Sequence, residues 1–436
     1  MLTHRIIVPY IKKKGTDPLT CWCLYLLIVL LPLAPGPAGA QTESGTMPDP
    51  RTGEAITLMN AFAERTGLIS AQPPRRYLWT DAFAVCNYLG LAHTTGNQDY
   101  TERALALVDQ VHHTLGRHRD DDRRTGWISG LAEDDGERHP TRGGFRIGKK
   151  LPERGPRDTY DDRLEWDRDG QYFHYLTRWM HALDQVTRAT REPRFSTWAH
   201  ELARAAFDAF TYQPALHRES RRMYWKMSID LRRALVPSMG QHDPLDGYVS
   251  TLQLQATAAT LPQPADGPNL DDATRQYAMM VKGGELATAD ALGLGGLLVD
   301  AWRVQQLMQQ GAVPETQLLD RLLDAALTGL QHYAQSGESS QPAGYRLAFR
   351  ELGLAIGLHA VERMHQEAQR TTTSPQQRAQ LQALMLYLPL REAIEAFWRD
   401  PAHQRTDTWF EHQDINTVML ATCLAPDGFL VLLPPD

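Results

Sequence analysis

The sequence lacks several features that would place it in a specialised class of protein. It has only four cysteines in 436 residues, too few for a disulfide-rich scaffold. No apolar run reaches the roughly twenty residues that a membrane-spanning helix needs. The net charge is −7, so the chain also lacks the basic surface that binds nucleic acid. The charge therefore predicts no nucleic-acid partner. Because 42% of the residues are hydrophobic, we expect a large folded core.

The first forty residues have the pattern of a secretory signal peptide. Basic residues up to Lys14 precede an apolar stretch at 21–34, which Pro32 interrupts, and small residues lead up to Ala40. We predict a signal peptide at 1–40 with cleavage near Ala40, a flexible linker at 41–50 and a single domain at 51–436. The protein would then be exported, to the periplasm or outside the cell, with no stable membrane span after cleavage. An uncleaved anchor is the alternative.

Cleavage would leave two cysteines, Cys86 and Cys423, near the two ends of the mature chain. In an oxidising compartment they could form a disulfide if the first and last helices became neighbours. The alternative is that both are small buried hydrophobic residues.

Apolar residues recur at helical spacing through nearly all of the domain, whereas no alternating run predicts a large sheet. About twelve helices are expected, at 55–65, 81–93, 100–115, from after Asp169 to 186, 195–210, 243–260, 271–281, 290–310, 314–336, 345–364, 375–399 and 409–424. The sequence therefore predicts an all-α fold.

Every second predicted helix begins with charged residues. These residues are Asp81, Asp169, Asp243, Asp290, Arg346 with Arg350, and His412 with Asp414. Asp169 is predicted to be an N-cap whose side chain accepts the free N–H groups of the next helix, and Gly170 would let the chain enter the helix without strain. Carboxylates are also favoured at the positive end of a helix dipole.

Two of these helices contain glycines, including Gly295 and Gly353, although glycine costs about 1 kcal/mol relative to alanine inside a helix. Close approach of two backbones in an inner ring of helices would explain that cost. A stretch of about fifty residues, 116–165, has no clear helical pattern and is expected to be a functional loop. Its glycine-rich part would form a lid whose cations meet an anionic substrate or solvent. These cations are Arg142, Arg146, Lys149 and Lys150.

Six helical hairpins with acidic and aromatic residues at alternate helix starts resemble the six-hairpin glycosidase superfamily. The local segments that carry the resemblance are WTDAF (79–83), EWDRDGQYFHYL (165–176) and QHDPLDG (241–247). The resemblance implies an (α/α)6 toroid of about twelve helices in an inner and an outer ring. That superfamily also includes relatives of N-acylglucosamine 2-epimerase.

Hydrolysis of a glycosidic bond needs one carboxyl group as an acid and a second as a base or nucleophile. Asp81, Asp169 and Asp243 are the candidate catalytic residues, and plain helix capping is the alternative for each. The candidate substrate-binding residues are Trp79, Trp166, Tyr172, His174, Trp225, His242, Arg346 and Arg350. The aromatic residues would stack on sugars or fill the core. The two arginines would grip an anion or neutralise nearby carboxylates.

Three functions follow as hypotheses. The first is an exported glycoside hydrolase, which uses paired carboxylates on a carbohydrate, possibly an anionic one. The second is a sugar epimerase or isomerase in which His174 or His242 moves a proton. The third is a non-catalytic glycan-binding or scaffold protein. None of the spacings predicts a metal site or a cofactor.

Overall fold

The computed structural model describes residues 49–215, 221–263, 265–313 and 316–432, all within the unit Pro48–Asp436. The predicted signal peptide and most of the predicted linker lie outside these residues, so both stay predictions. Within the described ranges, no helix is both long enough and apolar enough to cross a bilayer.

Six helices form a closed inner ring. They are α2 (Leu78–Thr95), α6 (Phe173–Thr190), α8 (Asp243–Ala258), α10 (Ala291–Gln309), α12 (Ala348–Arg370) and α16 (Gln413–Leu424). Each packs against the next in this order, and α16 packs against α2 to close the ring. The inner helices are buried on nearly all sides.

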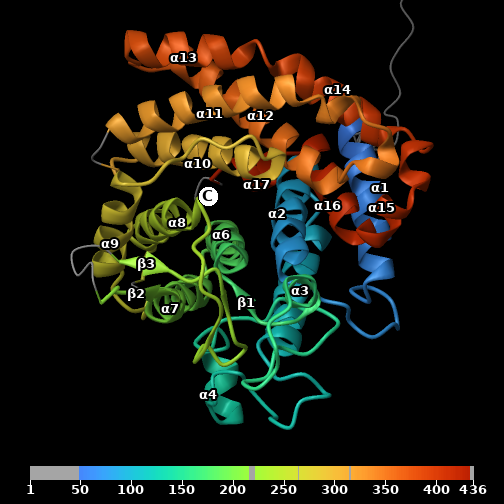
Figure 1. The fold of residues 1–436 in the computed structure, drawn as a ribbon, viewed down its shortest axis with the longest axis vertical. Helices are drawn as coiled ribbons and strands as arrows, with labels where there is room; N and C mark the ends of the chain where they lie inside the picture. Colours follow the sequence, from blue (N-terminus) through green and yellow to red (C-terminus); the bar gives the residue numbers. More distant parts are fainter. Residues whose placement is uncertain (1–48, 216–220, 264, 314–315, 433–436) are drawn as a thin grey trace, which may run out of the picture. The chain divides into compact units, whose positions relative to one another are not determined.

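Each inner helix also packs against an outer one. The outer helices are α3 (Asp99–Leu115), α7 (Pro193–Phe210), α9 (Asp271–Lys282), α11 (Thr316–Ser336), α13 (Pro375–Met385) with α14 (Leu388–Arg399), and α1 (Pro50–Arg65). Helix α1 packs against α16, so the first helix completes the last hairpin. Figure 1 shows α7, α9 and α13 at the periphery. This is the predicted (α/α)6 toroid.

Two predicted helices are each divided in the structure. The segment 375–399 breaks between α13 and α14, because Pro389 in the first turn of α14 has no N–H to donate and its ring clashes with the preceding turn. The segment 409–424 divides into α15 (Asp407–Glu411) and α16, because His412 leaves the helical conformation at φ −117° and ψ 26°.

Strands are few and short in the described residues, in agreement with the absence of an alternating pattern. They are β1 (Gln171–Tyr172), β2 (Thr211–Tyr212), β3 (Arg222–Met223), β4 (Lys226–Met227) and β5 (Ala234–Val236). The antiparallel order β1-β4-β5 joins the start of α6 to the segment after α7. The remaining short helices are α4 (Glu133–Arg138), α5 (Asp162–Asp167), α17 (Asp427–Leu430) and the 3-10 turns η1 (Glu338–Ser340), η2 (Ala343–Tyr345) and η3 (His403–Arg405).

The C-terminal helix α17 fills the interior of the ring. It contacts α2 and α10, and the ring of Phe429 stacks on Phe83 with 4.1 Å between centroids. Two side chains of α6 bind its backbone: Gln185 donates to the Gly428 carbonyl at 2.8 Å, and a ring nitrogen of His181 lies 3.0 Å from the Phe429 carbonyl. Helix α17 is therefore part of the core.

The two cysteines are not joined. Cys86 and Cys423 are both free and fully buried, and the Cys423 thiol donates to the carbonyl of Leu352 at 3.4 Å. The alternative interpretation, two small buried hydrophobic residues, is the one that the structure supports.

The glycines of α10 and α12 lie where these two helices touch. A Cβ atom added to Gly295 would lie 2.1 Å from the carbonyl oxygen of Gly353, and one added to Gly357 would lie 2.8 Å from the Cα atom of Gly295. Both distances are shorter than any real contact, so the two backbones approach more closely than side chains allow. The predicted reason for these glycines is confirmed.

Candidate functional site

The N-terminal ends of the six inner helices lie at one end of the ring, which we call the inner-helix mouth. His174 in the first turn of α6 lies 4.0 Å from Asp243 at the start of α8. Asp290, the N-cap of α10, pairs with Arg350 in the first turn of α12. The Phe349 N–H of α12 donates to Asn416 of α16 at 3.0 Å. These contacts link neighbouring helix starts around the ring.

An aromatic cluster surrounds His174 at this mouth. Its members are Trp79, Tyr172, His174, Tyr175 and Trp225. Around the His174 ring, the centroids of these aromatic side chains lie at 6.0 Å (Trp79), 5.4 Å (Tyr172), 4.9 Å (Tyr175) and 6.2 Å (Trp225). Trp166 from α5 packs edge-on against Trp225 at 4.9 Å and is 53% exposed. Aromatic residues that are far apart in sequence therefore meet beside one histidine.

The carboxyl group of Asp243 is buried next to this cluster. It is the first residue of α8, and its side chain accepts the Gly240 N–H at 3.0 Å. Burial raises the pKa of Asp243 to about 7, although the hydrogen bond from Gly240 opposes the shift. Burial and the Arg178 cation lower the pKa of His174 to about 3, so its imidazole is neutral at physiological pH. Asp243 can hence hold a proton near neutral pH beside an uncharged imidazole.

This raised pKa predicts a dependence of stability on pH. The folded state binds the proton of Asp243 more tightly than the unfolded chain, whose aspartates titrate near 3.8, so stability is lost as the pH rises from about 4 to about 7. Asn cannot ionise and keeps an oxygen for the Gly240 N–H. We expect the Tm of Asp243→Asn, relative to the wild type, to increase by a few degrees between pH 5 and pH 8, measured by thermal melts. A difference in Tm between variant and wild type that stays constant with pH would contradict the raised pKa. Other titrating groups, such as Asp81, are present in both proteins, so their effects cancel in this comparison.

Asp81 lies in the first turn of α2, but both of its oxygens are engaged. One lies 3.3 Å from the Arg76 guanidinium, and the other accepts the Tyr77 N–H at 2.8 Å. The pair is fully buried. Burial raises the pKa of Asp81 to about 6, and Arg76 opposes the shift. Helix α2 begins at Leu78, three residues before the predicted start.

Asp169 is not the N-cap of α6, so that prediction is wrong. The N-cap is Tyr172, because the chain first passes through strand β1 before the helix begins. The buried Asp169 carboxylate instead accepts the Gly148 N–H at 3.0 Å and lies 3.1 Å from Arg146. Arg119 approaches it at 3.5 Å. Asp169 therefore ties the long loop to the start of α6.

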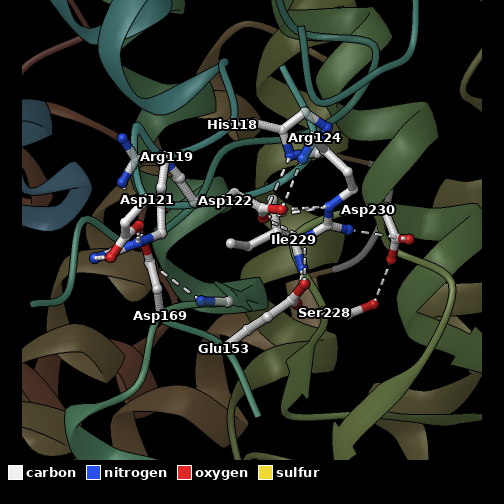
Figure 2. A network of polar contacts seen from close by, with 12 residues as sticks. His118, Arg119, Asp121, Asp122, Arg124, Glu153, Asp169, Ser228, Ile229 and Asp230 are labelled. Carbon is white, nitrogen blue, oxygen red and sulfur yellow. Dashed lines mark hydrogen bonds and ion pairs between the residues drawn. The ribbon is translucent and has the colours of Figure 1, made fainter. Parts of the chain in front are cut away.

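The long loop is anchored by ion pairs rather than left free in solvent. Arg124 contacts Asp122 at 2.7 Å and Glu153 at 2.6 Å, and Glu153 accepts the Ile229 N–H at 2.6 Å (Figure 2). Arg124 lowers the pKa of Asp122 to about 2. The acidic run at 120–122 thus partly belongs to this network, through Asp122. In the glycine-rich part, Phe145 and Ile147 are fully buried, so that segment is packed.

The remaining predicted site residues also have protein partners. Arg346 forms two bonds with Glu351, at 2.7 and 2.6 Å, and lies 3.8 Å from the ring centroid of Phe397. Arg350 pairs with Asp290 and is partly exposed. The Nε2 atom of His242 lies 2.7 Å from the carbonyl of Leu286. Neutralisation of carboxylates, the alternative role of the two arginines, fits these contacts.

Sequence reasoning missed a buried ionic group beneath the aromatic cluster. Arg178 lies 3.1 Å from Asp246 and 4.0 Å from Asp300, and Arg303 lies 2.9 Å from Asp300. Burial raises the pKa of Asp246 well above its usual range. Burial also acts to raise the pKa of Asp300, but the cations of Arg303 and Arg178 outweigh this effect, so the pKa of Asp300 is lowered. Asp246 is the member of this carboxyl pair that belongs to α8. Its place one turn after Asp243, on the same face of α8, was the available signal.

The tyrosine hydroxyls were not predicted as site residues, whereas Lys149 was predicted as one of the lid cations. The hydroxyls of Tyr77 and Tyr175 are 2.8 Å apart, and the Lys149 ammonium lies 5.9 Å from the ring centroid of Tyr77. In the described residues, no group of three or more histidine, cysteine, aspartate or glutamate side chains is arranged to hold a metal ion.

A scan against protein-family models and a search of curated proteins found no match. Two solved structures share the fold at a TM-score of 0.50. One is an inactive variant of the alpha-1,6-mannanase GH76A of Salegentibacter sp. HEL1_6 in complex with alpha-1,6-mannotetrose, which is 10% identical over 87% of this chain and 99% of that one. The other is a GH76 alpha-mannanase of Bacteroides thetaiotaomicron, 8% identical over 87% of this chain and 96% of that one.

These two mannanases share the (α/α)6 architecture with this chain. Cellobiose 2-epimerase from Spirochaeta thermophila DSM 6192 is also similar, with 11% identity over 86% of this chain and 98% of that one, but at a TM-score of 0.44 it adds no weight. At these identities the likeness defines the architecture alone. The predicted (α/α)6 toroid is confirmed, whereas the chemistry has to be argued from the site.

Proposed function

We propose that this protein is a carbohydrate-active enzyme that hydrolyses a glycosidic bond at the inner-helix mouth. The observation that carries the proposal is the position of Asp243, a buried carboxyl group with a pKa near 7, beside an aromatic cluster. A carboxyl group that is protonated at neutral pH can donate its proton to the leaving oxygen of a glycoside. Aromatic side chains supply the flat apolar surface on which sugar rings stack.

Hydrolysis also needs a second carboxylate. Asp81 and Asp169 are poor candidates because ion pairs and backbone N–H groups already engage their oxygens. Asp167, the last residue of α5, is exposed, and it lies near enough to Tyr172 to contribute to that residue's raised pKa, after burial and other charged neighbours. We therefore propose Asp243 as the general acid and Asp167 as the carboxylate that activates water or attacks the sugar.

Epimerisation is a weaker candidate on physical grounds. It requires a group that removes a proton from carbon, and the ability of a histidine to do so falls with its pKa. Burial lowers the pKa of His174 to about 3 and also lowers that of His242. Both imidazoles are consequently weaker bases than a free histidine. Two similar folds are named as mannanases, and this agrees with hydrolysis.

A panel of soluble glycans that includes alpha-1,6-mannan oligosaccharides tests the proposal. Hydrolysis releases new reducing ends, whereas epimerisation changes the sugar without releasing any. We expect Trp225→Ala to weaken glycan binding by about 10-fold, because one stacking surface at the mouth is lost. Trp198→Ala, which removes a half-exposed tryptophan from outer helix α7, is the matched control and should bind like the wild type. A protein that binds glycans without converting them would be the non-catalytic alternative, and one that binds none would contradict the proposal.

We also propose export, on the strength of the N-terminal pattern. N-terminal sequencing of the protein recovered from its native host tests it, with Gln41 expected as the first residue.

A further inference from the structure

We infer that the glycan bound at the inner-helix mouth carries an anionic substituent, a carboxylate or a sulfate, and that Lys149 contacts this group. The inference rests on the proposed function, because it names the class of glycan that the same site takes.

The four cations of the glycine-rich loop differ in their ion-pair partners and in their exposure. Arg142 pairs with Glu201 at 2.9 Å, and Arg146 pairs with Asp169 at 3.1 Å. Lys150 is exposed to solvent. Lys149 is half-buried, yet its ammonium has no hydrogen bond or ion pair with any described residue, and it lies 5.9 Å from the ring centroid of Tyr77. Among the four cations of this loop, Lys149 is therefore the partly buried one that lacks an ion-pair partner in the described part of the chain.

Nearby carboxylates do not neutralise Lys149. Asp167 and Asp169 lie near enough to influence the pKa of Lys149, but neither carboxylate lies within 4.0 Å of its ammonium, the limit for an ion pair. The Asp169 carboxylate is already held by Arg146, Arg119 and the Gly148 N–H. Withdrawing an ammonium from water costs free energy unless a partner compensates for it. A ligand anion would supply that partner.

A second, independent feature of the mouth also favours negative charge. In five of the six inner helices, namely α2, α6, α8, α12 and α16, no backbone N–H of the first turn donates to the N-cap side chain. Only α10 has such a hydrogen bond, in which the Gly293 N–H donates to the Asp290 side chain. The N-terminal end of a helix carries a partial positive charge, which an N-cap oxygen would partly offset. The charge of Asp81 is balanced by Arg76, so this carboxylate does not offset the partial charges of the helix ends.

Lys149 is connected to the proposed reaction centre through two tyrosines. Its ammonium lies over Tyr77, whose hydroxyl is 2.8 Å from that of Tyr175, and the Tyr175 ring lies 4.9 Å from His174. The anionic group would thus be bound away from Asp243, in a neighbouring sugar subsite. Lys149 would act there as a binding residue and would take no part in proton transfer.

Titration calorimetry of the full chain with matched glycans tests this inference. The probes are an oligouronide and its methyl ester, and a sulfated alpha-1,6-mannan oligosaccharide and its desulfated form. We expect the wild type to prefer at least one anionic form over its neutral partner by about 10- to 100-fold, the value of a hydrogen bond to a charged group. Lys149→Gln should remove this preference and leave the affinity for the neutral form unchanged. Lys149→Arg should restore part of it, and Lys150→Gln, the exposed neighbour, should have less than about a 2-fold effect.

Comparison of the oligouronide pair with the sulfated pair shows whether the site prefers a carboxylate or a sulfate. Equal affinity of the wild type for charged and neutral forms would overturn the inference and leave the proposed hydrolysis standing. An equal loss of both affinities in Lys149→Gln would also overturn it, because Lys149 would then act through the packing of Tyr77. If no glycan binds in any arm, both the inference and the proposed function fail.

Discussion

The Asp243→Asn variant is expected to lose at least about 100-fold in kcat for glycan hydrolysis, with little change in KM. General acid catalysis contributes about 100- to 10,000-fold, and an amide cannot donate the proton that the leaving oxygen needs. The variant should still fold, because Asn keeps an oxygen for the Gly240 N–H. Initial rates of reducing-end release, on whichever glycan the wild type cleaves, measure the effect.

The control for this variant is Asp271→Asn, which changes an aspartate at the start of outer helix α9 and should retain full activity. A loss in Asp167→Asn of similar size would support Asp167 as the second carboxylate. Because a general acid is active when protonated, the wild-type rate should also fall as the pH rises above about 7. Near-wild-type cleavage by Asp243→Asn would remove Asp243 from the mechanism.

The second large effect is expected from Gly295→Ala in α10. The new methyl group would overlap the carbonyl oxygen of Gly353, since the two atoms would lie 2.1 Å apart. Both groups belong to helix backbones that cannot rotate away, so α10 and α12 would have to separate. We expect a loss of at least about 2 kcal/mol in the free energy of unfolding, even after the gain in helix propensity. Urea denaturation followed by circular dichroism measures it.

Gly296→Ala, one residue further along α10, is the matched control. A Cβ atom at Gly296 would meet only Arg178, at 3.6 Å, which is an ordinary contact. Alanine should therefore stabilise the helix by up to about 1 kcal/mol. If both variants were equally stable, the close approach of α10 and α12 would not be what requires glycine at 295.

The sequence predicted the ring and much of its mouth because these depend on patterns that recur along the chain. Helical periodicity located nearly all of the helices, and charged starts at every second helix separated the inner helices from the outer ones. Glycines in α10 and α12 indicated that two helices touch. His174 and Asp243 were both among the predicted site residues, and they meet at 4.0 Å although they are far apart in sequence.

The predicted N-cap role of Asp169 is wrong, because the partners of its carboxylate come from another segment. Asp169 precedes a helical pattern, so its sequence is typical of an N-cap, but the loop that carries Arg146 and Gly148 folds back onto it. Asp300 gave no signal, because its pairing with Arg178 depends on how α6 and α10 are rotated in the ring. Helical periodicity does not define the rotation of a helix about its axis precisely enough to predict a hydrogen bond.

The sequence by itself determined the helical class of this protein, its hairpin order and the clustering of polar and aromatic residues at the inner-helix starts, because these follow from local periodicity and chain connectivity. Only the tertiary structure decided which of these groups remain available for chemistry. Asp81 and Asp169 are engaged by cations and backbone N–H groups, Asp243 is buried with a raised pKa, and Lys149 has no ion-pair partner among the described residues. Desolvation and ion pairing act between residues that are distant in the sequence, so the state of each charge is set by the packed ring.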